Sequence, residues 1–139
     1  MILLDTNVIS ESFRRRPNRG VIAWANAQPV NELFICAPVL AELRFGAERL
    51  APGRAQTHLR AAIDYIENDY FRGRVWAFDG QAAAEYGRLT AERERMGRRI
   101  NQMDGLIAAI AATHGAVIAT RDVTDFADLG IDLVNPFDA

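Results

Sequence analysis

The chain begins with Met1-Ile2-Leu3-Leu4-Asp5-Thr6-Asn7, an apolar run that ends in three polar residues. A short, uninterrupted apolar run is typical of a strand that is buried on both faces of a parallel sheet. Such a strand delivers the polar side chains that follow it to the carboxyl edge of the sheet, where open α/β folds bind their ligands. The opening stretch therefore predicts an α/β protein and makes Asp5 its first candidate site residue.

Further apolar runs follow and alternate with helical patterns, without hairpin signals between them. We expect strands over 33–36, 75–78, 116–119 and 131–134. Apolar residues at helical spacing predict helices around 21–25, over 38–50, from 59 to 70, after Asp79 with Ala82, Ala83, Tyr86 and Leu89 inward, and over 102–114. Strands that alternate with helices indicate α/β with a mostly parallel sheet.

The composition is that of an ordinary folded chain. With 139 residues, 50% hydrophobic and 24% charged, and no repeat or linker, we expect a single domain over 1–139. The single cysteine, Cys36, excludes an internal disulfide and a two-cysteine metal motif. The longest weakly polar run, 105–119, is too short for a membrane helix, and the amino terminus lacks a basic leader. We expect a cytoplasmic protein that does not contact membranes.

All 16 basic residues are arginine, and the formal net charge is −2. The absence of lysine excludes a P-loop, whose lysine contacts the nucleotide phosphates, and Schiff-base chemistry, which requires an amine. The near-neutral balance predicts that any polyanionic partner is held by local patches or by a metal ion rather than by overall charge.

Four carboxylates lie at positions where a catalytic or metal-binding site is expected. Asp5 and Asp122 follow predicted strands, whereas Glu42 and Asp104 lie among apolar residues of predicted helices. If the four converge, they require a cation, because unit charges about 4 Å apart repel by about 4 kcal/mol at an effective dielectric of 20. Oxygen ligands without histidine or cysteine favour Mg²⁺ or Mn²⁺. One or two such ions would serve phosphodiester hydrolysis by activating a water molecule.

Each acid also has a purely structural interpretation. Asp5 could cap a helix, Asp104 could be a first-turn acid, and Asp122 with Asp125 could form a capping pair. Glu42 could be paired with an arginine distant in the sequence. The occurrence of all four at the expected places favours a site over four independent structural roles.

The motifs together resemble the PIN-domain family, most closely the VapC and FitB type of toxin from type II toxin–antitoxin pairs. They are Asp5-Thr6-Asn7-Val8-Ile9 after the first strand, Ala41-Glu42-Leu43-Arg44-Phe45-Gly46, Asp104-Gly105-Leu106-Ile107-Ala108-Ala109, and Thr120-Arg121-Asp122 with Asp125-Phe126. They occur in the family's order and spacing over nearly the whole chain.

The resemblance implies a three-layer α/β/α domain around a central, mostly parallel sheet of four to five short strands. It implies a Mg²⁺- or Mn²⁺-dependent endoribonuclease toxin that hydrolyses RNA with metal-activated water. The acids Asp5, Glu42, Asp104 and Asp122 would be the catalytic and metal-binding residues, and Thr6 and Thr120 would support them. Many relatives have asparagine at the position of Asp122 and an aspartate at that of Asp125, so either residue could complete the site. We favour Asp122, because it comes directly after the strand, and take Asp125 as a supporting residue.

The resemblance also implies partners. They are an RNA substrate such as tRNA, and a small cognate antitoxin that occupies a groove leading to the acids. Relatives usually form homodimers, and larger toxin–antitoxin assemblies are possible.

Two arginine-rich stretches are candidate RNA contacts. They comprise Arg14, Arg15, Arg16 and Arg19, and Arg93, Arg95, Arg98 and Arg99. We expect phosphate contacts chiefly from Arg14, Arg15, Arg16, Arg98 and Arg99, and the alternative is a solvated surface. Among the aromatic residues, Trp24, Trp76, Phe34 and Phe45 are expected in the core, whereas Tyr65, Tyr70 and Phe71 belong to the core or to a dimer face.

Other functions remain to be weighed. A haloacid-dehalogenase-like phosphatase or a response-regulator receiver also places aspartates after the first strand. The phosphatase needs a second acid where this chain has Asn7, however, and both classes normally use a lysine. A PIN-like module that binds RNA or protein without cutting is the second alternative, and a cleavage assay separates it from the nuclease.

Overall fold

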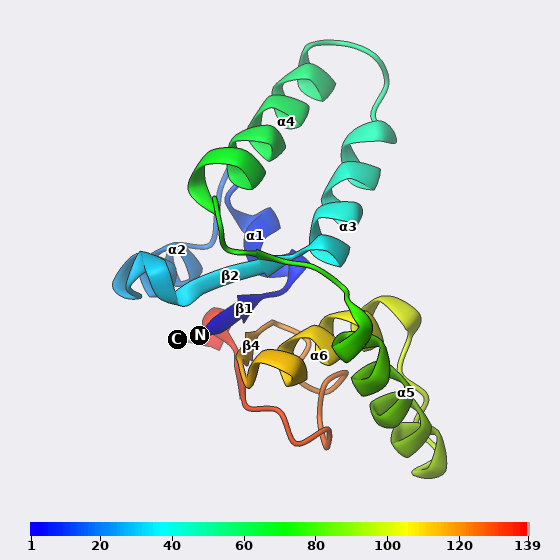
Figure 1. The fold of residues 1–139 in the computed structure, drawn as a ribbon. Helices are drawn as coiled ribbons and strands as arrows, with labels where there is room; N and C mark the ends of the chain where they lie inside the picture. Colours follow the sequence, from blue (N-terminus) through cyan, green and yellow to red (C-terminus); the bar gives the residue numbers. More distant parts are fainter. Residues whose placement is uncertain (139) are drawn as a thin grey trace.

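A computed structural model describes residues 1–138 (Figure 1). Five parallel strands form one sheet in the order β3-β2-β1-β4-β5. The strands are β1 (Ile2–Leu4), β2 (Leu33–Cys36), β3 (Val75–Trp76), β4 (Val117–Ala119) and β5 (Leu133–Val134). The chain adds strands on one side of β1 and then crosses to the other side, so the order reverses between β1 and β4. Receiver domains have the order 2-1-3-4-5, so that alternative is wrong.

Helices cover both faces of the sheet and make the three-layer architecture that the sequence predicts. They are α1 (Thr6–Glu11), α2 (Arg19–Ala27), α3 (Ala37–Glu48), α4 (Arg54–Tyr65), α5 (Gly80–Arg95) and α6 (Gln102–His114). In Figure 1, α3 and α4 rise side by side from the sheet, while α5 and α6 pack together on the other side. Short helical turns occupy Val30–Glu32, Ile66–Tyr70 and Pro136–Asp138.

Helix α6 is the most buried helix of the fold. It is apolar on nearly every side, and Ile107, Ala108 and Ile110 are fully buried. Asn101 caps its amino terminus, and Gly115 ends it with a φ of 62°, a left-handed conformation that favours glycine. Its Gly105 lets α5 approach closely, because a Cβ at this position would lie 2.9 Å from the Tyr86 ring. Asp104, in the first turn of α6, is therefore held at the amino end of a buried helix.

Some sequence predictions about elements are wrong in detail. Phe45, expected in the core, is 63% exposed, because α3 buries only its opposite face and Phe45 projects outward beneath the guanidinium of Arg49. Ala83, expected inward, is exposed, because it lies about 100° around α5 from the buried Ala82. The predicted helix over 59–70 starts earlier and changes at Tyr65 into a π-helical turn.

Within residues 1–138, no helix is both long enough and apolar enough to cross a membrane.

Candidate active site

The site begins at the reversal of strand order between β1 and β4. Leu4 and Ala119 are paired in register, and the Asp5 amide donates to the Ala119 carbonyl at 2.9 Å. The next residues therefore meet: the Thr120 hydroxyl donates to Asp5 Oδ2 at 2.7 Å. Both side chains are buried. This is the point at which open α/β sheets bind ligands.

The two carboxylate oxygens of Asp5 have different partners. Its Oδ1 accepts from the Thr6 amide at 2.8 Å and caps α1, so the capping interpretation is confirmed. Its Oδ2 is bonded instead to the Thr120 hydroxyl and, at 3.2 Å, to the Asn7 side-chain amide. One oxygen thus fixes the helix, while the other lies among the polar residues of the site.

Asn7 joins the two ends of the site, a role that sequence reasoning missed. Its Nδ2 donates to Asp5 Oδ2 at 3.2 Å and to Asp122 Oδ2 at 3.0 Å, and its Oδ1 accepts from the Arg121 amide at 3.1 Å. Its place in the Asp5-Thr6-Asn7 run, two residues after the first acid, was the available signal. Asn7 therefore ties Asp122 to Asp5.

The loop after β4 holds Asp122 in a turn rather than at a helix start. The Asp122 amide donates to the Thr120 hydroxyl at 2.9 Å, and the Asp125 amide donates to the Asp122 carbonyl at 3.0 Å. No helix follows within this loop in the described chain. The interpretation of Asp122 and Asp125 as a capping pair is therefore wrong.

Glu42 reaches the site from α3. It is half-buried, and its Oε1 accepts from the Thr6 hydroxyl at 2.5 Å. It forms no ion pair with any arginine in the part of the chain that the structure describes, so the predicted structural alternative is wrong. Thr6 thus connects the Asp5 cap to Glu42, consistent with its predicted supporting role.

Asp104 comes from the first turn of α6. The Asn101 side chain caps this helix by accepting from the Asp104 amide at 2.8 Å, and its Nδ2 donates to Asp104 Oδ2 at 2.6 Å. The first-turn interpretation is therefore confirmed. Asn101 was not singled out in the sequence, although an asparagine three residues before an acid is a recognisable capping signal. It holds the carboxylate beside the other acids.

Neighbouring acids contribute to the pKa shifts of Asp5 and Asp104. Burial raises the pKa of Asp5, an effect that the Thr120 hydrogen bond opposes and that Glu42 and Asp122 reinforce. Burial, with weaker contributions from Asp5, Asp125 and Glu42, raises the pKa of Asp104 to about 6. Asp122 therefore interacts with the Asp5 side of the cluster, and Asp125 with the Asp104 side.

The donors present fit a hard divalent cation. All are oxygens, and none of Asp5, Glu42, Asp104, Asp122 and Asp125 forms an ion pair within residues 1–138. In the same part of the chain, no three acidic, histidine or cysteine side chains lie close enough to hold a metal ion as they stand. Binding would require the less buried acids to turn toward Asp5.

The candidate RNA-binding arginines differ in how free they are. Arg15 and Arg16 are exposed. Arg14 pairs with the buried Glu11 at 3.4 Å, Arg98 with Asp128 at 2.5 Å, and Arg99 with Glu94 at 3.8 Å. Arg93, which belongs to the second arginine-rich stretch, is only 4% exposed and donates to backbone carbonyls, so it is not free to contact a phosphate.

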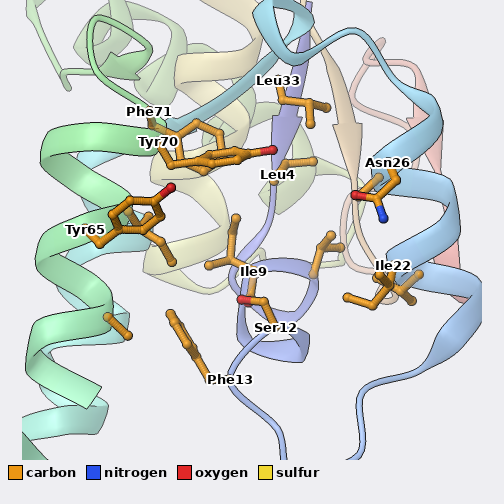
Figure 2. A pocket seen from close by; sticks show the side chains of 15 residues that line it. Leu4, Ile9, Ser12, Phe13, Ile22, Asn26, Leu33, Tyr65, Tyr70 and Phe71 are labelled. Atoms are coloured by element: carbon orange, nitrogen blue, oxygen red, sulfur yellow. The ribbon is translucent and has the colours of Figure 1, made fainter. Parts of the chain in front are cut away.

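An apolar pocket of about 360 Å³ adjoins α1. Figure 2 shows Leu4 and Ile9 at its centre, Tyr65 of α4 on one side, and Ile22 and Asn26 of α2 on the other. Tyr65 is 57% exposed, whereas Phe71 is buried. Because Asp5 caps the amino end of α1, and Val8 and Ile9 of the same helix line the pocket, Asp5 and the pocket lie about one helical turn apart.

Comparisons with known proteins identify the family of the chain. The PIN domain matches residues 2–131. The chain is 40% identical to VapC ribonuclease Y4jK of Sinorhizobium fredii over 99% of both proteins, and 36% identical to toxin FitB of Neisseria gonorrhoeae, also over 99% of both. The crystal structure of FitAcB from Neisseria gonorrhoeae superposes with a TM-score of 0.91 at 35% identity, covering 100% of each chain. The chain therefore belongs to the PIN-domain family, and its relatives within that family are VapC- and FitB-type toxins.

Proposed function

We propose that the protein is a metal-dependent endoribonuclease and the toxin of a type II toxin–antitoxin pair. The observation that carries the proposal is the set of carboxylates gathered from β1, α3, α6 and the loop after β4, without a cationic partner in the described chain. The set contains Asp5, Glu42 and Asp104, and its fourth carboxylate is Asp122 or Asp125. The names of the ribonuclease and toxin relatives support the same activity.

The chain's own residues have distinct tasks in this proposal. Asp5, Glu42 and Asp104 would hold one or two Mg²⁺ or Mn²⁺ ions. When bound, such ions activate water and neutralise the scissile phosphate. Thr120 and Asn7 orient Asp5 through Oδ2, and Thr6 orients Glu42, as hydrogen bonds from outer residues orient metal-binding carboxylates generally.

Exposed positive charge beyond the carboxyl end of α1, whose amino end Asp5 caps, would help to hold the RNA. Arg15 and Arg16 are exposed in the loop that follows α1, the helix whose amino end carries Thr6 and Asn7. Exposed arginines contact phosphates without reading sequence. Arg98 and Arg99 would have to leave their carboxylate partners to do the same. Small structured RNA such as tRNA is the substrate pool to test first.

A small antitoxin is the proposed protein partner. The pocket beside α1 is lined almost wholly by apolar side chains, and a peptide segment with apolar residues would bury them there. The pocket residues of α1 begin at Val8, three residues after Asp5. An antitoxin segment bound in the pocket could therefore block access to Asp5. We also propose that the toxin forms a homodimer. Size-exclusion chromatography with light scattering of the toxin, alone and co-expressed with the neighbouring gene product, tests both parts.

The decisive experiment is cleavage of total small RNA with Mg²⁺ or Mn²⁺, with and without EDTA. Asp5→Asn should lose at least about 100-fold in rate, because even residues that only orient a ligand contribute 10- to 100-fold. Asp132→Asn serves as the control, since this exposed acid precedes β5 at the opposite edge of the sheet. Equal rates for parent and Asp5→Asn would refute the assignment, and no cleavage by folded, antitoxin-free parent would favour the non-catalytic binding module.

A further inference from the structure

The loop after β4 carries two of the acids but has no regular structure to hold them. Residues 121–132 form only turns before β5 begins. Asp122 and Asp125 are exposed, and the side chains that anchor the loop are Phe126 and Leu129, 0% and 6% exposed. Asn7 and Thr120 hold the start of this loop at Asp122. Within residues 1–138, the part of the loop around Asp125 lacks such a contact from the β1 side, so a polar contact from elsewhere is needed to define its backbone orientation.

Arg93 supplies that contact. It lies in the last turn of α5, is 4% exposed, and forms no ion pair with a described carboxylate. Its Nη1 donates to the Asp125 carbonyl at 3.1 Å and to the Ala127 carbonyl at 2.9 Å. Its Nε donates to the Arg98 carbonyl at 3.0 Å. One buried guanidinium therefore grips the loop on both sides of Phe126.

The packing of α5 on α6 connects the Arg93 contacts to Asp104. Helix α5 packs on α6 closely enough that a Cβ at Gly105 would lie 2.9 Å from Tyr86 and 3.2 Å from Thr90. Asp104 precedes that glycine. The separation between the Asp125 backbone and Asp104 is thus determined by two packed helices and a planar, multiply bonded guanidinium. Buried cations are rare unless their donors are satisfied, and here the acceptors belong to the loop that bears the acids.

We propose that Arg93 is a positioning residue for the carboxylate cluster, holding the loop after β4 so that Asp122 and Asp125 remain within reach of a cation bound by Asp5 and Asp104. The inference deepens the proposed function and rests on it. Arg93 touches neither substrate nor metal in this scheme. It acts through the backbone of residues 125 and 127.

The chain provides a matched control five residues away. Arg98 also contacts the loop, through an ion pair with Asp128, but both partners are exposed. An exposed pair contributes little and is screened by salt. Arg98→Met removes one guanidinium from the same loop without disturbing the carbonyls that Arg93 binds. A general effect of losing an arginine near the site would therefore appear in both variants, and a positioning effect only in Arg93→Met.

The test is Mn²⁺ binding to the full chain, measured by electron paramagnetic resonance of free Mn²⁺. Arg93→Met should bind Mn²⁺ about 10- to 100-fold more weakly than the parent, the usual effect of losing an outer contact that orients metal ligands, whereas Arg98→Met should bind as the parent does. Arg93→Lys keeps the charge but not the planar fork, and should be intermediate. Millimolar guanidinium should restore binding to Arg93→Ala, and the same concentration of urea should not.

Each outcome is informative. If folded Arg93→Met, or folded Arg93→Lys should the first not fold, binds Mn²⁺ as tightly as the parent, the proposal is wrong. Equal weakening in Arg98→Met would also overturn it. Gly115→Ala, which strains the far end of α6, controls for lost stability and should leave Mn²⁺ affinity unchanged. If Asp5→Asn binds Mn²⁺ like the parent, the proposed metal site itself fails, a result distinct from failure of Arg93 alone.

Discussion

Asp104→Asn should make the protein more stable near neutral pH when no divalent cation is added. Burial and the neighbouring acids raise the pKa of Asp104 from 3.8 to about 6. Because the folded-state pKa is above the unfolded-state value, the unfolded chain releases the proton first as the pH rises. The contribution of Asp104 to the free energy of unfolding is therefore highest below about pH 4, falls between pH 4 and 6, and is level above pH 6.

The size of the effect follows from the site. A change from 3.8 to about 6 corresponds at full strength to about 3 kcal/mol. Asp104 is only half-buried, and solvent screening reduces this to about 1.5 kcal/mol. The variant also loses a favourable charge in the first turn of α6, which offsets about 0.5 kcal/mol. The net gain is about 1 kcal/mol at pH 7.5, or about 3 °C in Tm for a chain of this length.

Urea unfolding in EDTA at pH 4 and pH 7.5 measures this difference. Asp104→Asn should exceed the parent at pH 7.5 and not at pH 4, where the parent carboxyl is protonated in the fold. Asp132→Asn is the control and should show no such pH-dependent gain, because Asp132 is exposed at the other edge of the sheet. Destabilisation of Asp104→Asn at pH 7.5, or the same change at both pH values, would refute the electrostatic argument.

Three further predictions concern single contacts. Gly105→Ala should destabilise the fold by about 1–3 kcal/mol, because the added Cβ would meet Tyr86 at 2.9 Å; thermal unfolding measures it, and an unchanged Tm would contradict the close packing of α5 on α6. Asn101→Ala should reduce stability by about 1 kcal/mol by removing the cap of α6, and urea unfolding with Asn31→Ala as control checks it. Asn7→Leu should lower RNA cleavage about 10-fold or more, since it releases Asp122 from Asp5; a rate equal to that of the parent would show that this link is dispensable.

The candidate acids could be identified in the sequence because each leaves a local signal. Asp5 follows an apolar strand, and Glu42 and Asp104 interrupt apolar helical faces. The polar residues that orient them were harder to identify. Asn7 and Asn101 act through hydrogen bonds to partners whose positions depend on the sheet or the helix start, and an asparagine in a sequence does not show what it binds.

Nothing in the sequence signals that Arg93 is buried. In the sequence it is one of several arginines in a basic stretch, indistinguishable from its neighbours. In the fold it is buried under the loop after β4, because its position on α5 faces α6 and that loop rather than solvent. Phe45 was misplaced for the same reason: an apolar side chain predicts burial only if a neighbouring element covers that face of its helix.

The sequence by itself determined the elements and their order along the chain, because apolar periodicity and capping residues are local properties. It also predicted the oxygen-only chemistry of the candidate site, since the acids at the expected positions have no histidine or cysteine among them. Only the tertiary structure decided which strands are neighbours, and so that residues 5 and 120 meet at the β1–β4 reversal. Strand order and helix orientation depend on contacts between distant residues, which local patterns do not encode.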